Sequence, residues 1–247
     1  MPLTPSHAAA ALLLERTWPR MPLAALVIGS MSPDFEYLLR LIPRGEFGHT
    51  PMGLLLFCLP VGLVVWGVYR AWIRPMVHDL LPPGLSAGTA PRCDASWSAG
   101  ALAVLLGAVS HVTWDAFTHA DGFFVGLLPP LASVALPAVL SGLRWYQLLQ
   151  HASTAVGALV IAWVAVRWWR NHPAADRRFA PRQARRAVAA VVVLSIVSGL
   201  GAVLNGARVA DRDLAVVLGY AAVGTMVGFA LASVALAAYW HGVTRAD

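Results

Sequence analysis

The segment SHVTWDAFTH, residues 110–119, combines metal-binding residue types with a helical spacing. His111, Asp115 and His119 follow one another at intervals of four, and such residues lie on one side of an α-helix, about 6 Å apart along its axis. Imidazole nitrogen and carboxylate oxygen are ligands of zinc, and manganese or iron bind them with more oxygen ligands. The spacing predicts half of a site for a divalent metal, with zinc as first choice and manganese or iron as alternatives. Such a metal would also serve hydrolysis, because it lowers the pKa of a bound water.

Further candidate ligands lie in the segments TPSH, SPD, GHTPMG and QHAST. They are His7, Asp34, His49 and His151. Together with the pair on the helix, they could complete one metal site or two. A histidine near a membrane interface is often only an amphipathic residue that faces lipid headgroups. The H-x-x-x-D pattern is weak by itself, and it gains weight only if these four segments meet on the same side of the membrane.

Two glutamates close to the SPD and GHTPMG segments are candidates for acid–base chemistry. Glu36 and Glu46 could act as a general base or as partners of a ligand, because a ligating histidine usually donates its other N–H to a carboxylate or carbonyl group. The competing explanation is that they are interfacial charges paired with Arg40 and Arg44.

The composition places these residues in a membrane protein. Of the 247 residues, 58% are hydrophobic and 12% are charged, whereas about 25% are charged in a typical soluble domain. All 18 basic residues are arginines. A net charge of +6 in such a chain is more typical of the cytoplasmic loops that fix topology than of nucleic-acid binding. We therefore expect membrane lipids as partners, an amphiphilic substrate, and no nucleic acid.

Five segments are apolar over the roughly 20 residues that a spanning helix needs. They are residues 51–72, 99–117, 152–169, 187–207 and 214–240. The first fifty residues would carry Asp34 and Glu36 into the bilayer if they crossed it, which is costly. We predict that they form a pair of short helices lying along or dipping into one membrane face, with Ser6 capping the first and SPD at a turn. The predicted fold is all-α and polytopic, with about five transmembrane helices.

The arginines give an orientation and a division of the chain. The segment 167–186 should be cytoplasmic because positive charge is enriched there. Its arginines are Arg167, Arg170, Arg177, Arg178, Arg182, Arg185 and Arg186. Alternation of the spans then places the candidate ligands on the outer face of a bacterial inner membrane, although the arginines before residue 45 oppose this orientation.

The predicted parts are a membrane domain with the metal site (1–170), an arginine-rich cytoplasmic loop (171–186) and two C-terminal transmembrane helices (187–247).

Five segments together resemble a bacterial membrane family, the one built on the domain of unknown function 4184. They are MPLTPSHAAAAL, VIGSMSPDFEYLLRL, GHTPMGLLLF, SHVTWDAFTH and LLQHAST, and the resemblance covers roughly residues 1–170. This resemblance implies a related fold, and it implies no particular activity.

The order of the motifs is also similar, more distantly, to bacterial membrane-bound metal-dependent hydrolases and to the helical zinc-dependent phospholipases C. This similarity implies metal-ligand roles for five residues, while His119 and His151 match less clearly. The five are His7, Asp34, His49, His111 and Asp115. The phospholipases close their site with His-x-x-x-Glu, whereas Ala155 follows His151 at that spacing. RGEFGHT has one residue more between glycine and histidine than the motif of some hydrolases. Either departure could mean one metal in place of two, or a site without chemistry.

Three functions fit these observations. The first is a metal-dependent hydrolase that acts on a lipid or phosphoester at the outer interface. The second is a transporter or metal-handling protein, which should show internal repeats and polar residues near the bilayer midplane; the later spans are almost purely apolar. The third is a non-catalytic structural membrane protein.

Overall fold

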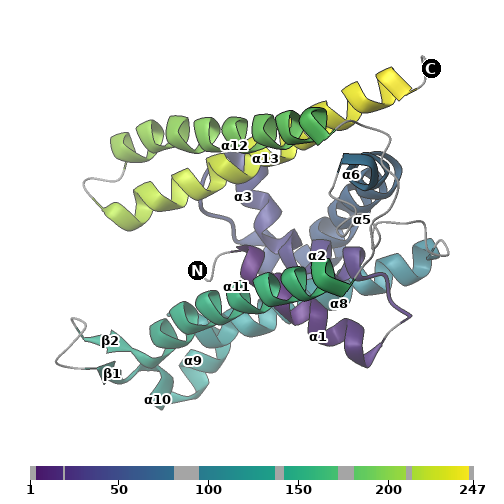
Figure 1. Ribbon diagram of the computed structural model, residues 1–247. Helices are drawn as coiled ribbons and strands as arrows, with labels where there is room; N and C mark the ends of the chain where they lie inside the picture. The colour runs from purple at the N-terminus through teal and green to yellow at the C-terminus, as the bar shows by residue number, and fades with distance from the viewer. Residues whose placement is uncertain are drawn as a thin grey trace. The chain divides into compact units, whose positions relative to one another are not determined.

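The computed structural model describes residues 4–18, 20–80, 95–136, 142–171, 181–209 and 213–244 (Figure 1). Most of these residues are helical, which confirms the all-α fold class. The strands among them form one short antiparallel ribbon, β1 (Val134–Leu136) with β2 (Leu143–Arg144).

Five helices in the described ranges are long and apolar enough to cross a membrane. They are Pro51–Leu80, Trp97–Leu127, Trp145–Arg167, Arg182–Val209 and Leu214–Thr244. Each contains most or all of one predicted apolar segment. Large apolar side chains stay exposed on them, for example Leu159, Val193 and Leu231, as expected for surfaces that contact lipid. These features confirm the polytopic architecture.

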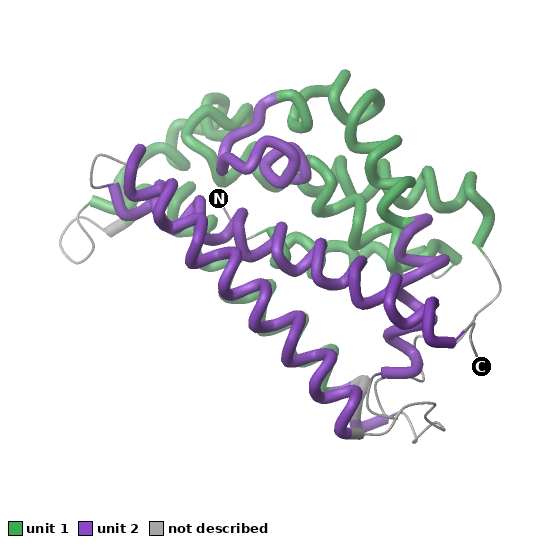
Figure 2. Tube along the Cα trace, turned by 90° about the horizontal axis from the view of Figure 1, so that it is seen from above, with its two compact units in different colours: residues 1–34, 47–66, 95–166 green, residues 35–46, 67–94, 167–247 purple. Residues whose placement is uncertain are grey.

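The chain divides into two compact units (Figure 2). The first contains residues 1–34, 47–66 and 95–166, and the second contains residues 35–46, 67–94 and 167–247. The units interleave along the chain, whereas the predicted domains were consecutive. All six candidate ligands between residues 7 and 119 belong to the first unit.

The first unit is built mainly from short N-terminal helices and three long apolar ones. Its helices are η1 (Thr4–His7), α1 (Ala8–Thr17), α2 (Leu23–Met31), η2 (Ser32–Asp34), η3 (Phe47–His49), α4 (Pro51–Gly53), η4 (Leu54–Cys58), α5 (Leu59–Val68), α8 (Trp97–Thr118), α9 (Phe123–Leu127), α10 (Pro129–Ala132) and α11 (Trp145–Asn171). Helices α5 and α11 continue a few residues into the second unit.

The N-terminal region forms short helices, as predicted, with SPD as the tight turn η2. The predicted cap at Ser6 is wrong. Ser6 lies inside the 3₁₀ turn η1, and its hydroxyl donates instead to the Thr154 carbonyl of α11 at 3.1 Å. The competing acceptor is distant in sequence, so local capping rules could not reveal it.

Helix α2 packs directly on α8 because glycines face the partner backbone. A Cβ added to Gly29 would collide with the backbone of Val104, and one added to Gly107 would collide with the Leu26 carbonyl oxygen. Small residues at a helix contact let two backbones approach closely, which is how membrane helices commonly associate. This contact brings the C-terminal end of α2 and the following SPD turn alongside the second half of α8.

Helix α5 packs on the first half of α8 in an antiparallel register. The Val104 side chain fills the space over Gly62, and the Trp66 ring lies on Gly100. Trp66 also meets Trp97 edge to face, with ring centroids 5.2 Å apart. Because the two helices run in opposite directions, the start of the first span, just after His49, lies toward the C-terminal end of α8.

The second unit contains α3 (Phe35–Arg40), η5 (Tyr69–Ile73), α6 (Arg74–Leu80), α12 (Pro181–Val209) and α13 (Leu214–Thr244). Helices α12 and α13 lie side by side (Figure 1) and meet through small residues, with Gly199 against Thr225 and Gly228 against Ser198. Much of the predicted arginine-rich loop, residues 172–180, lies outside the described residues. Helix α12 begins at Pro181, so Arg182 and Arg185 stand in its first turns.

Candidate metal centre

Histidine and aspartate side chains from four segments of the first unit meet at one end of α8. His7 comes from η1, Asp34 from η2, His49 from η3, and His111 and Asp115 from α8. All except His49 are buried, and His111 and Asp34 are completely inaccessible. The segments TPSH, SPD, GHTPMG and SHVTWDAFTH therefore lie together.

His111 and Asp115 form the helical pair predicted from their spacing. The His111 Nε2 atom lies 3.3 Å from Asp115 Oδ2. On its other side, His111 Nδ1 lies 2.7 Å from the carbonyl oxygen of Ser30 in α2. A carbonyl oxygen only accepts, so Nδ1 carries the proton in this contact. Nε2 is thereby the nitrogen left for a ligand, the arrangement that orients histidines in metal sites.

The SPD turn and the GHT segment are locked together by a glycine. A Cβ on Gly48 would lie 2.5 Å from the Pro33 carbonyl oxygen, so only glycine allows this approach. Thr50 then starts the first span as an N-cap, accepting a hydrogen bond from Gly53 N at 2.9 Å with Pro51 in the first turn. Between these fixed points, His49 Nε2 lies 3.5 Å from Asp34 Oδ1 and 3.6 Å from Asp115 Oδ2.

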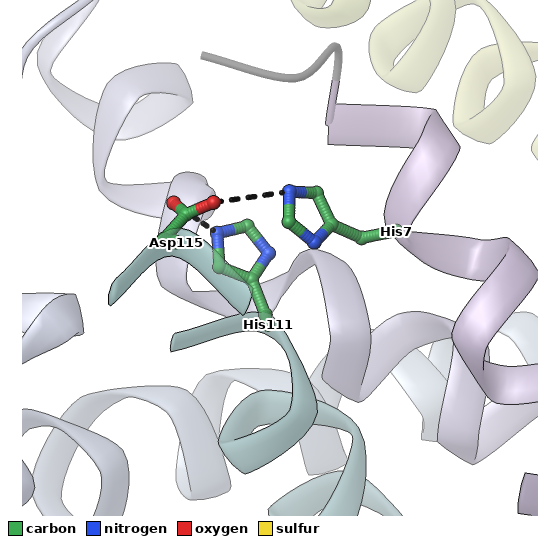
Figure 3. A group of neighbouring side chains, drawn as sticks. All are labelled: His7, His111 and Asp115. Carbon is green, nitrogen blue, oxygen red and sulfur yellow. Dashed lines mark ion pairs between the residues drawn. The ribbon is translucent and has the colours of Figure 1, made fainter. Parts of the chain in front are cut away.

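His7 reaches the cluster from the N-terminal turn. Its ring stacks on that of His111, with centroids 3.8 Å apart and planes inclined by 19°, and its Nε2 lies 3.4 Å from Asp115 Oδ1 (Figure 3). Burial, helped by the neighbouring His111, lowers the pKa of His7 to about 3. His7 is therefore neutral at pH 7 and can donate its lone pair to a cation without first losing a proton.

His119 joins the cluster, but it does so from beyond the helix. Helix α8 ends at Thr118, and His119 has an extended backbone with φ −116° and ψ 146°. Its Nδ1 lies 3.0 Å from the Asp115 carbonyl oxygen and 3.7 Å from Asp115 Oδ1. The prediction that His119 continues the helical face of His111 and Asp115 is wrong, because α8 ends one residue before it.

The distances between these atoms fit a shared cation. Ligand atoms that lie about 2.0–2.1 Å from a tetrahedral zinc are about 3.3–3.4 Å from one another. The imidazole–carboxylate distances in the cluster span 3.3–3.7 Å, too long for good hydrogen bonds and close to that spacing. Two groups in particular have ligand atoms all within 4.8 Å of one another: His7 with His111 and Asp115, and Asp34 with His49 and His111.

Four polar atoms of the cluster have no hydrogen-bond partner among the described residues. Nε2 of His7 and His111, and Oδ1 of Asp34 and Asp115, are buried and make no hydrogen bond with a described residue. No arginine of the described residues forms an ion pair with either carboxylate. Buried carboxylates are costly without a compensating charge. The donor set and its charge therefore fit a divalent metal ion.

The side chains of the cluster are not equally exposed. The side chains of His7, His111, Asp34 and Asp115 are at most 9% exposed, whereas those of His49 and His119 are 21% and 25% exposed. A cation held here would be approached past His49 and His119.

The other three sequence candidates are not among the residues of this cluster. His151 is exposed on α11. Within the described residues, it forms no hydrogen bond or ion pair with a residue of the cluster. Glu36 and Glu46 belong to the second unit: buried Glu36 pairs with Arg40 at 2.8 Å, and exposed Glu46 pairs with Arg44 at 3.2 Å. Their proposed roles in chemistry stay predictions.

Sequence reasoning missed two groups that hold the ligands. Thr4 donates a hydrogen bond from Oγ1 to Asp34 Oδ2 at 2.6 Å, and the Ser30 carbonyl orients His111. The spacing of Thr4 and His7 in TPSH was a usable signal. The Ser30 contact has no side-chain signature, because a backbone oxygen makes it.

Substitution of Gly107 by alanine is expected to weaken metal binding without removing a ligand. Its Cβ would lie 2.5 Å from Ser30 N, so α2 must shift and carry the Ser30 carbonyl away from His111. Overpacking of this kind costs about 1–3 kcal/mol of stability. Zinc affinity and melting temperature of the purified protein test this, with Gly201→Ala as control, because nothing lies within 4 Å of a Cβ there. Parent-like zinc affinity in Gly107→Ala would show that the Ser30 contact is dispensable.

These features define the class of the protein: a multi-pass helical membrane protein with a buried histidine–aspartate cluster that could hold a metal ion. The chain belongs to the family of the domain of unknown function 4184 (DUF4184), whose model matches residues 1–238. The match extends well past residue 170 and so includes α12 and most of α13. Comparison with curated proteins and with solved structures gave no match.

Proposed function

We propose that this protein is an integral-membrane, metal-dependent hydrolase that acts on an amphiphilic lipid or phosphoester at the outer membrane face. The observation that carries the proposal is the environment of His111. Its Nδ1 faces the Ser30 carbonyl, while its Nε2 lies 3.3 Å from Asp115 Oδ2 and 3.7 Å from Asp34 Oδ1. Nε2 of His111 and one oxygen of each carboxylate thus face one another in a fully buried space. A divalent cation between them would be attracted to both carboxylates and could accept the Nε2 lone pair.

The partial exposure of His49 and His119 favours catalysis over a purely structural metal. Structural zinc sites are enclosed by four protein ligands, whereas catalytic sites keep a position for water or substrate. When bound, the metal would polarise an ester or phosphoryl oxygen and supply a nucleophile from water at neutral pH. His7, His111 and the two aspartates would hold it from the buried side. His49 and His119 would border the approach.

The way in which Asp115 is shared allows one ion or two. Its Oδ2 faces His111 and His49, whereas its Oδ1 faces His7 and His119. His119 Nδ1 carries the proton that it donates to the Asp115 carbonyl oxygen, so Oδ1 faces one imidazole nitrogen that can bind a metal and Oδ2 faces two. The two carboxylate oxygens still allow two adjacent cations as well as one. Nitrogen-rich ligation favours zinc, and manganese or iron are the alternatives.

The proposed location rests on the arginine distribution and on the position of the cluster. The cluster lies at the start of the first span, at residue 49, and toward the C-terminal end of α8, at residues 111–119, where we expect a site to meet lipid headgroups first. The cytoplasmic assignment of the segment 167–186 places this end on the outer face of a bacterial inner membrane. Glu36 and Glu46 remain candidate general bases, and Glu36→Gln and Glu46→Gln test them.

The experiment is a metal analysis of the detergent-solubilised protein, followed by a hydrolysis screen. We expect one or two zinc-class ions per chain, lost in His111→Ala and in Asp115→Ala, and hydrolysis of a lipid or phosphoester that a chelator abolishes. Metal binding without hydrolysis across the screen would favour a metal-handling role. A folded parent that binds no metal after loading would leave a structural membrane protein.

A further inference from the structure

The N-terminal turn η1 points two side chains toward the cluster, and only His7 belongs to the ligand set discussed so far. Side chains three residues apart in a 3₁₀-helix lie one above the other. Thr4 and His7 have this spacing in η1, and both are buried. His7 reaches Asp115, and Thr4 reaches Asp34. One short turn therefore contacts both carboxylates of the cluster.

We propose that Thr4 is a positioning residue that makes Asp34 a one-oxygen metal ligand; the inference rests on the proposed metal-dependent function. Thr4 Oγ1 donates its single proton to Asp34 Oδ2 at 2.6 Å, in the buried interior. The other oxygen, Oδ1, has no hydrogen-bond partner among the described residues and lies 3.5 Å from His49 Nε2 and 3.7 Å from His111 Nε2. The hydroxyl thus distinguishes two oxygens that are chemically equivalent in a free carboxylate.

The position of Thr4 is itself fixed. Ser6, in the same turn, donates to the Thr154 carbonyl at 3.1 Å. A Cβ on Gly157 would lie 2.8 Å from the Ser6 carbonyl oxygen, so η1 sits directly on the backbone of α11. The stacking of His7 on His111 holds the other end of the turn. Thr4 is therefore held where its hydroxyl meets Asp34, and the carboxylate cannot turn both oxygens toward the imidazoles while that bond exists.

The test compares Thr4→Val with Thr4→Ser and Ser6→Ala. Valine keeps the shape of threonine and removes the hydroxyl, whereas serine keeps the hydroxyl and removes a methyl group. Ser6→Ala loosens the turn and leaves the Thr4 hydroxyl in place. The readouts are the zinc dissociation constant, from competition with a chromophoric chelator, and the melting temperature of the metal-free protein. A merely structural role would change the melting temperature and leave the dissociation constant unchanged.

We expect Thr4→Val to weaken zinc binding about 10–100-fold, as is typical when a group that orients a ligand is lost. Thr4→Ser should restore the affinity of the parent, and Ser6→Ala should lose less than Thr4→Val. Parent-like affinity in Thr4→Val, or an equal loss in Ser6→Ala, overturns the inference. If Thr4→Val does not fold, Thr4→Ala replaces it, and a failure of serine to support zinc binding overturns the inference as well. A parent without zinc overturns the metal centre too, whereas a zinc-binding parent with an unaffected Thr4→Val overturns only the role of Thr4.

Discussion

Asp115→Asn is expected to abolish metal binding while leaving the protein folded. Asp115 lies within 3.3–3.7 Å of imidazole nitrogens from four histidines, more than any other residue of the cluster. Loss of a group that only hydrogen-bonds to a metal ligand costs up to about 100-fold in metal affinity. Loss of this shared ligand should therefore weaken zinc binding by more than about 100-fold. Asparagine keeps the shape of the side chain but removes one of two buried charges that no described arginine balances.

Two measurements on detergent-solubilised protein check this prediction: the zinc content after loading and the melting temperature after chelation. Asp121→Asn is the matched control, because Asp121 is an exposed carboxylate just beyond α8. It should retain the zinc and the melting temperature of the parent. If Asp115→Asn instead kept its zinc, the distances around Asp115 would reflect protonated imidazoles paired with the carboxylate, and the metal centre would be wrong.

The spans and the helical half of the site could be predicted because their signals are local. A run of about 20 apolar residues is enough to identify a spanning helix. Residues four apart share a helix face whatever surrounds them, so His111 and Asp115 were placed correctly. The convergence of His7, Asp34 and His49 on this pair was inferred from motif order and membrane sidedness. The structure brings these three residues together with the helical pair.

What the sequence could not give depends on contacts between distant segments. The orientation of His111 requires the Ser30 carbonyl, which reaches it only because Gly29 and Gly107 let α2 approach α8. His119 leaves the helical face because α8 ends at Thr118. His151 was expected beside the cluster as the opening of the third span. Helix α11 instead contacts η1 through Thr154 and Gly157, and His151 is exposed.

Metal loading is expected to stabilise the protein through the cluster and independently of His151. A ligand present at about 100 times its dissociation constant stabilises the folded state by about 2.7 kcal/mol, provided that it does not bind the unfolded chain. The melting temperature of the parent should therefore rise when zinc is added, and a chelator should reverse the rise. His111→Ala should show no such rise, because its completely buried Nε2 faces both carboxylates.

His151→Ala decides between the ligand set of the sequence and that of the structure. His151→Ala and His111→Ala each remove one imidazole, so any general effect of zinc on histidine-containing surfaces is the same in both variants. We expect His151→Ala to keep the full zinc-dependent rise, because its side chain is exposed on α11 and outside the cluster. A lost rise in His151→Ala would mean that the metal-loaded site recruits the start of α11. If the melting temperature of His111→Ala still rose with zinc, zinc would stabilise the protein at some other place. The buried cluster would then not be the metal site.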